Sequence, residues 1–419
     1  MQNMKKTLLT VTGLCISTSA FSGGYRVALQ GQQALGMGHT GVAMSESAEV
    51  VFFNPAAMSF LESDSNITAG ITLISGDTEY QNQQTNTSAK TDNPIGTPVG
   101  LYYTKKYDDK FHFGLGLYTP YGNTVEWPTD WAGSHLVNNI ELKAIYIQPT
   151  VSYKINDKYS VGLGLSYISG DVEFNRNLNT STVDANGDRS NVTVKAEGVS
   201  DWNFNLGFLA KPTDELSVGV SYRSEATMEA RNEPATFSNI PGSLQSTFTS
   251  PTTFNADLVL PAEITVGVAY DLDSKTILAF DITRTQWSAY ESLDIDFGNG
   301  QSSINARNYS DSNVYRFGAQ HALNDAIVLR GGIYFDKTPV EAGYFAPETP
   351  RNDSIGLTAG GSYAVNKQLD LDFSLLVLMF EEFNGSYDHI INSDGSTSSF
   401  GGDYLSSVIT LGFGVNYKF

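Results

Sequence analysis

Residues 409–419 read ITLGFGVNYKF, a stretch that alternates strictly between two kinds of side chain. One set is large and apolar, namely Ile409, Leu411, Phe413, Val415, Tyr417 and Phe419. The intervening residues are mostly small or polar. A two-residue period is that of a β-strand, whose successive side chains point to opposite sides. An apolar face opposite a polar one predicts lipid outside and a polar lumen inside.

The same alternation recurs upstream, beginning near Ile67. Tight polar turns, such as those at Asp108–Asp109 and Asn156–Asp157, alternate along the chain with loops of about 15 to 25 residues. Six such turns and seven loops join fourteen strands. Short turns on one side and long loops on the other are typical of an outer-membrane barrel. We therefore predict an all-β fold, a 14-stranded antiparallel transmembrane β-barrel spanning residues 65–419.

The first 22 residues have the organisation of an export signal. Lys5 and Lys6 precede an apolar run from Leu8 to Ile16, and Ala20 and Ser22 provide a cleavage site. The run is too short to cross a bilayer, and no later stretch reaches the roughly 20 apolar residues of a membrane helix. We expect the mature protein to lack Cys15, the single cysteine, and so to contain neither a disulfide nor a thiolate metal site.

Residues 23–64 differ from the rest of the chain. They are sparsely charged, rich in Gly, Ala and Ser, and lack the alternation of the following strands. A compact segment of this kind before a barrel predicts a plug, or hatch, inside the lumen. The formal net charge of −20 makes nucleic acid an improbable partner.

Several short motifs, in this order and spacing, resemble the FadL-type outer-membrane transporters of long-chain fatty acids and other hydrophobic compounds. They are FNPA at 53–56, PYG at 120–122, LPAE at 260–263, VGVAY at 266–270, WS at 287–288, VYRF at 314–317, FD at 335–336 and TPV at 338–340. The resemblance covers essentially the whole mature chain. It implies fourteen strands with an N-terminal hatch, a monomer, and a location in the bacterial outer membrane.

The resemblance also implies a mechanism, in which a hydrophobic ligand enters an internal pocket and leaves sideways through a kinked third strand. Gly122 corresponds to the kink, and Asn54, Pro55 and Ala56 correspond to a triplet that lies against it. Asn54 and Pro55 also suit the start of a helical turn. Gly24 and Tyr25, at the start of the hatch, become candidates for the movable floor of the pocket. An ordinary turn remains the alternative role for Gly122 and for the Asn-Pro pair.

The resemblance places Arg176 and Arg307 at the two basic positions that bind a ligand carboxylate, a role for which the arginine fork is well suited. Phe174 has the same inward phase as Arg176 and is a further candidate substrate contact. Arg223, Arg316 and Arg330 are in lumen phase as well. The alternative for all inward arginines is an ion pair with acidic residues of the hatch or wall. The loop at 177–190 is short for the family, so an outer substrate groove is left unassigned.

Two other functions stay open. One is transport of uncharged aromatic or aliphatic hydrocarbons, for which Arg176 and Arg307 would be dispensable. The other is a surface-binding structural barrel. The five histidines, at positions 39, 112, 135, 321 and 389, fit no nucleophile-elbow or metal-ligand spacing, so we expect neither an enzyme nor a metal or other cofactor. The expected partners are the hydrophobic ligand, outer-membrane lipid and lipopolysaccharide, and the barrel-assembly machinery, which would recognise Phe419.

Overall fold

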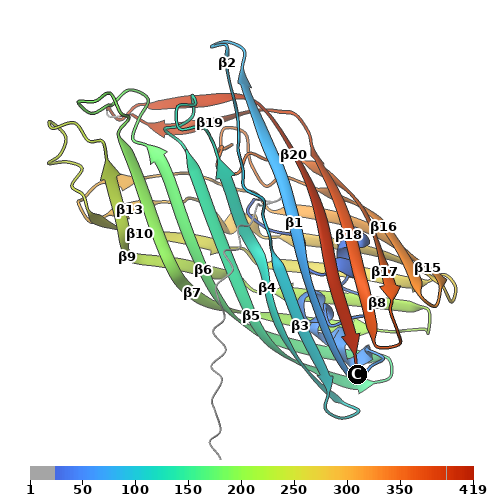
Figure 1. Ribbon diagram of the computed structural model, residues 1–419. Coiled ribbons are helices and arrows are strands. Elements are labelled where there is room, and N and C mark those ends of the chain that lie inside the picture. The colour runs from blue at the N-terminus through green and yellow to red at the C-terminus, as the bar shows by residue number, and fades with distance from the viewer. Residues whose placement is uncertain (1–23, 393) are drawn as a thin grey trace, which may run out of the picture.

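The computed structural model describes residues 24–392 and 394–419, so the predicted signal at 1–22 lies outside the described residues. The chain forms a closed antiparallel barrel of 14 strands, as predicted (Figure 1). The wall strands are β1 (Ser65–Asn82), β3 (Val99–Lys106), β4 (Phe111–Glu126), β5 (Asn139–Asn156), β6 (Tyr159–Asn177), β7 (Asn191–Ala210), β8 (Leu216–Arg223) continued by β9 (Ala226–Ser238), β10 (Thr252–Leu260) continued by β11 (Glu263–Asp271), β12 (Thr276–Thr285), β15 (Ser312–Asn324), β16 (Ile327–Asp336), β17 (Ser354–Ala364), β18 (Leu369–Phe380) and β20 (Thr397–Lys418).

Shorter elements complete the chain. Hairpin extensions and loop strands are β2 (Thr87–Lys90), β13 (Ile295–Phe297), β14 (Ser302–Ser303) and β19 (Phe383–Ile391). The helices are α1 (Gln32–Gly36), α2 (Val50–Phe53) and the 3₁₀ turns η1 (Pro55–Phe60) and η2 (Trp287–Ala289). Among the described residues, no helix has the length and apolar character needed to cross a membrane.

The barrel closes between its first and last strands. β1 pairs with β20 from Asn66↔Lys418 to Gln81↔Asp403, which leaves no free sheet edge along this seam. Alternation on β20 is as predicted: Leu411, Phe413 and Val415 are exposed on the outside, whereas Thr410 and Asn416 are buried.

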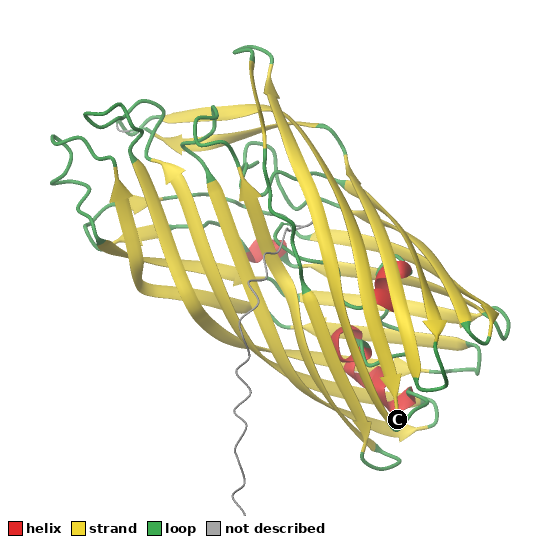
Figure 2. Ribbon diagram, in the orientation of Figure 1, coloured by secondary structure: helices red, strands yellow, loops and turns green. Residues whose placement is uncertain are grey.

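Side chains fix the tight turns at one end of the barrel. Asp108 accepts hydrogen bonds at Oδ1 from the backbone nitrogens of Lys110 and Phe111, at 2.8 and 2.7 Å. Asn156, Asn324 and Asn366 each accept two backbone bonds in the same way. Asn and Asp favour such turns because their short side chains replace a backbone acceptor. The longer connections lie at the opposite end (Figure 2).

Residues 24–61 lie within the ring of strands, where Figure 2 shows their short helices. Most of these residues are buried. Backbone nitrogens of Gly41 and Val42 donate to Asp281 of β12, at 2.8 and 3.2 Å, and that of Gly38 donates to Thr358 of β17 at 2.8 Å. Wall and segment are therefore joined directly by polar contacts on several sides.

Wall glycines make this close approach possible. A Cβ atom on Gly318 would lie 2.2 Å from the carbonyl oxygen of Met37, and one on Gly332 would lie 2.2 Å from the nitrogen of Gly38. Both distances are shorter than any real contact. Glycine at these positions lets the backbone of the N-terminal segment lie directly against the wall.

Candidate functional site

β4 carries an irregularity at Thr119 and Pro120. Its pairing with β5 shifts between Tyr118 and Tyr121, and its ladder with β3 ends at Gly100↔Tyr118. Pro120 has no N–H to donate, which disfavours a regular ladder. Gly122 was the predicted kink. It instead pairs with Lys143 and does not adopt a positive φ, so the irregularity falls two residues earlier.

The start of the N-terminal segment pairs with β4 at this irregularity. The Val27 nitrogen donates to the Pro120 oxygen at 2.8 Å, and the Gly122 nitrogen donates to the Tyr25 oxygen at 3.0 Å. Arg26 and Tyr121 form the antiparallel bridge between them. Residues 25–27 thus act as a short inner strand on a part of β4 that β3 does not reach.

Gly24 and Tyr25 occupy an aromatic enclosure. Gly24 has φ 66°, a conformation that glycine adopts readily, and a Cβ atom there would lie 2.5 Å from the Trp287 ring. The Tyr25 ring lies 5.0 Å from Trp287 and 5.4 Å from Tyr290, edge to face in both cases. Its hydroxyl donates to the carbonyl oxygen of Val259. Burial raises the pKa of Tyr25 well above its ordinary value, so this hydroxyl remains a donor.

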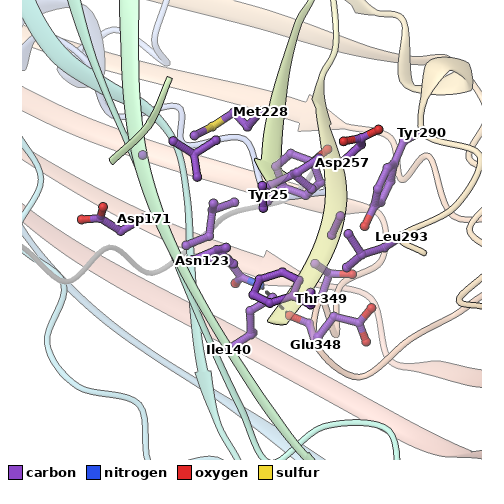
Figure 3. A pocket seen from close by; sticks show the side chains of 18 residues that line it. Tyr25, Asn123, Ile140, Asp171, Met228, Asp257, Tyr290, Leu293, Glu348 and Thr349 are labelled. Atoms are coloured by element: carbon purple, nitrogen blue, oxygen red, sulfur yellow. Dashed lines mark hydrogen bonds between the residues drawn. The ribbon is translucent and has the colours of Figure 1, made fainter. Parts of the chain in front are cut away.

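A cavity begins at Tyr25 and encloses about 680 Å³, counting the part that opens to solvent. Its walls are mainly apolar and include Leu142, Val199, Met228, Leu258 and Tyr290. Figure 3 shows Tyr25, Met228 and Glu348 among the side chains that line it. A mainly apolar lining of this kind suits a hydrophobic ligand.

The cavity reaches an interruption in the wall between β7 and β9. β7 pairs with β9 only as far as Val194↔Ala235, and its ladder with β8 starts at Asn205↔Arg223. Val199 and Met228 line the cavity from the two sides of this interruption. Asp171 and Asp257, which also line it, are exposed at the barrel surface. The cavity is therefore accessible from the side of the barrel.

The interruption lies beyond the apolar band of the wall. The half-buried Tyr167 and the exposed Trp202 form an aromatic pair 5.1 Å apart on β6 and β7, typical of an interfacial belt. On the loop side of this pair the outward residues are charged, and they include Glu173, Lys195 and Glu197. The opening consequently faces a polar layer.

A loop folded into the barrel forms another part of the cavity wall. Residues 345–350 between β16 and β17 are all buried. The Asn123 side chain donates to the Glu348 carbonyl oxygen at 2.6 Å, and the Trp127 indole donates to the Pro347 carbonyl oxygen at 3.0 Å. These bonds direct the loop inward and place Glu348 beside the cavity.

Arg307 forms an ion pair with Glu348, and both side chains are only 6% exposed. Burial alone lowers the pKa of Arg307, but the Glu348 carboxylate and the neighbouring Tyr290, Tyr387 and Tyr309 together more than compensate, so the pKa lies above its ordinary value. Arg176 instead donates to the His135 carbonyl oxygen and to Ser303 Oγ, each at 2.9 Å. Neither arginine lines the cavity, nor does Phe174, which packs among neighbouring apolar side chains. Contact of these three residues with a ligand remains a prediction.

The three other arginines predicted to face the lumen are buried. Arg223 donates to the Tyr118 hydroxyl at 2.8 Å and to the Phe52 carbonyl oxygen at 3.1 Å. Arg316 donates to Thr283 at 2.6 Å, and Arg330 donates to Gln320 at 2.6 Å. Most of their partners are neutral acceptors, but Arg330 also lies 3.9 Å from Glu46 Oε2, an ion pair with the N-terminal segment of the kind expected as the alternative.

Comparison with known proteins decides the family. The family described as outer membrane protein transport protein (OMPP1/FadL/TodX) matches residues 13–419. The chain belongs to this family. Its location in the bacterial outer membrane, predicted from the sequence, is supported by the same match and by the barrel.

Relatives of this FadL-family chain share modest identity over most of their length. The long-chain fatty acid transport protein of Escherichia coli (strain K12) is 23% identical over 403 residues, which covers 88% of this chain and 90% of that protein. Outer membrane protein P1 of Haemophilus influenzae is 23% identical over 422 residues, with 90% of each chain covered.

Two solved structures share the fold. A Pseudomonas aeruginosa FadL homologue gives a TM-score of 0.83 at 17% identity, covering 95% of this chain and 100% of that one. The Pseudomonas putida toluene transporter TodX gives a TM-score of 0.70 at 17% identity, covering 95% of this chain and 99% of that one.

In this FadL-family barrel, the triplet Asn54, Pro55 and Ala56 starts η1 as predicted. Asn54 accepts a bond from the Ala56 nitrogen at 3.1 Å, and Pro55 follows as the first residue of the turn. The triplet's contacts differ from those expected. The Asn54 side chain donates to the Phe208 carbonyl oxygen on β7 at 3.0 Å, and Ser160 of β6 donates to the Ala56 oxygen at 2.8 Å. These contacts are on β6 and β7, whereas the irregularity is on β4.

The sequence did not reveal several residues around the cavity, among them Glu348, Tyr290 and Met228. Glu348 follows Pro347 in a long connection, a setting in which a glutamate is normally solvated. The presence of two prolines among small and apolar residues at 345–350 was the available signal that this loop is ordered. Among the described residues, no group of three or more His, Cys, Asp or Glu side chains has the arrangement of a metal site.

Proposed function

We propose that this protein takes up hydrophobic molecules across the outer membrane. The ligand occupies the cavity above Tyr25, residues 24–27 move, and the ligand leaves sideways where β4 lacks its β3 partner. The observation that carries the proposal is the position of Tyr25. The same residue lines the cavity and, through its backbone oxygen, bonds to β4 at Gly122.

Energetics favour a sideways exit. Returning an alkyl chain to water costs about 0.8 kcal/mol per methylene, so a route from an apolar cavity directly to lipid avoids a large barrier. The process needs no energy source if the ligand moves down its own gradient. Long-chain fatty acids are the first substrates to test, because curated relatives carry that description. Uncharged hydrocarbons are the second candidate, since the part of the chain that the structure describes places no arginine or lysine in the cavity lining.

Other features of the proposal concern assembly. Phe419 is 51% exposed at the end of the last strand, and its backbone exchanges hydrogen bonds with Ser65 at 3.0 Å in both directions. A terminal aromatic in this position suits recognition by the barrel-assembly machinery. We propose a monomer surrounded by lipid and lipopolysaccharide.

Gly24→Ala tests the proposed gate. Alanine at φ 66° costs about 1–2 kcal/mol and its Cβ would overlap Trp287, so Tyr25 should lose its position. We expect slower uptake of radiolabelled oleate and toluene by cells that depend on this protein, and faster amide exchange at residues 25–27.

Gly187→Ala is the matched control. Gly187 has φ 90°, but no heavy atom lies within 4 Å of the position its Cβ would take, so it carries the backbone cost without the overlap. Equal uptake by the two variants would contradict the gate. A surface-binding barrel would bind its partner equally well in both variants, and uptake would not depend on the protein at all.

A further inference from the structure

The cavity has an acidic lining. Among the described residues that line it, Asp171, Asp257 and Glu348 are the charged ones, and none is an arginine or lysine. Asp257 is paired with the exposed Arg231, whereas Asp171 accepts a bond from the Gly198 nitrogen at 2.8 Å. Both aspartates are at the outer mouth, so Glu348 supplies the carboxylate of the buried part.

Glu348 neutralises the nearest buried cation. Arg307 is 5% exposed, and its Nη2 donates to Glu348 Oε1. The guanidinium also lies 5.4 Å from the centre of the Tyr387 ring. Its fork is thus partly occupied by a carboxylate that the chain itself provides.

A carboxylate ligand would meet two obstacles here. It would have to displace Glu348 from Arg307, which would leave a buried glutamate without its cation. Otherwise it would lie beside Glu348 and gain no new cation. Loss of one partner from a buried pair is strongly destabilising, because the remaining charge stays desolvated. An uncharged ligand meets neither obstacle and retains the benefit of the apolar walls.

We propose that Glu348 determines specificity by occupying the cation that a ligand carboxylate would need, so that the cavity accepts uncharged hydrophobic molecules. The inference rests on the proposed uptake function and names its substrate class. Glu348 acts through Arg307 and through its own charge at the cavity wall.

Three ligands with one alkyl chain test this proposal: 1-dodecanol, dodecanoate and dodecylammonium. Binding to the purified full-length barrel in detergent at pH 8 should be tightest for dodecanol and weakest for dodecanoate. Dodecylammonium should bind with intermediate affinity, because its charge loses hydration on binding but is not repelled by the acidic lining. These three measurements need no variant.

Glu348→Gln should then free Arg307. We expect dodecanoate to bind about tenfold more tightly, which corresponds to roughly 1.4 kcal/mol, with little change for dodecanol. The double variant Arg307→Met/Glu348→Gln should lose that gain, because it contains no freed guanidinium. Glu341→Gln is the matched control, since Glu341 is an exposed carboxylate of the same loop. Folding of each variant is checked by its heat-dependent migration in gels.

The outcomes are distinguishable. Dodecanoate that binds the wild-type protein as tightly as dodecanol would overturn the proposed specificity while leaving the uptake function intact. The proposed specificity is likewise overturned if the folded Glu348→Gln variant keeps the wild-type ratio of dodecanoate affinity to dodecanol affinity. If the wild-type protein binds none of the three compounds, the proposed function itself fails.

Discussion

Glu49, in the N-terminal segment, is a carboxylate buried where no cation is bonded to it. Its side chain is nearly inaccessible, and one oxygen has no hydrogen-bond partner among the described residues. Burial, followed by the charge of Asp372, raises the pKa of Glu49 to about 7. Single side chains of this kind set how firmly the segment is held within the barrel.

The packing of the segment should therefore depend on pH through Glu49. The folded segment keeps this proton up to about pH 7, whereas an unfolded chain releases it near 4.5. The contribution of this proton to the stability of the folded segment is complete below pH 4.5 and is lost as the pH rises through 7. Between pH 5 and pH 8 the loss is on the order of 2 kcal/mol. Amide exchange of α1, corrected for the intrinsic rate, should show this loss.

Glu49→Gln should make the exchange of α1 much less sensitive to pH. Glu62→Gln, which alters an exposed carboxylate just after η1, should leave the wild-type dependence in place. An unchanged pH profile in Glu49→Gln would show that other groups control the packing, with Asp372 the first to examine.

At the scale of elements, the sequence predicts the wall well because strands and turns depend on local chemistry. Alternation follows from the two-residue period of a strand, and Asp108 or Asn156 specifies a turn by bonding to its own neighbours. Local signals also predicted the helical turn η1, because Asn54 and Pro55 suit its start.

The site was less predictable because it depends on contacts between distant parts of the chain. The resemblance gave Arg307 as a carboxylate-binding position, yet its pairing with Glu348 requires that residues 345–350 fold into the barrel. That path depends on Asn123 and Trp127, more than 200 positions earlier in the chain. The wall interruption was likewise invisible, since β7 and β9 alternate normally on both sides of it.

The interruption between β7 and β9 gives a prediction at this scale. Val199→Trp should fill the cavity where it approaches the barrel surface and slow uptake of labelled dodecanol severalfold. Leu165→Trp is the control, because Leu165 is exposed on the outer apolar face and does not line the cavity. Uptake that is equally fast in both variants would show that ligands reach the cavity by another path.

For the whole molecule, wall and interior fit each other closely. Gly332→Ala would place a Cβ 2.2 Å from the Gly38 nitrogen, so the segment should shift while the barrel still closes. Gly331→Ala changes the preceding residue of the same strand, whose Cβ would meet nothing nearer than 3.9 Å. We expect higher single-channel conductance for Gly332→Ala in planar bilayers and wild-type conductance for Gly331→Ala. Equal conductance would mean that the segment tolerates the intrusion.

The filled interior also bears on how much of this protein a bacterium tolerates. An open barrel of fourteen strands would admit antibiotics and bile salts in proportion to its abundance. Here residues 24–61 bond to strands around the barrel, including β12 and β17. Under the proposed uptake function, additional copies would therefore raise the uptake of hydrophobic molecules without a matching rise in the leakage of polar solutes, and the permeability barrier would be preserved.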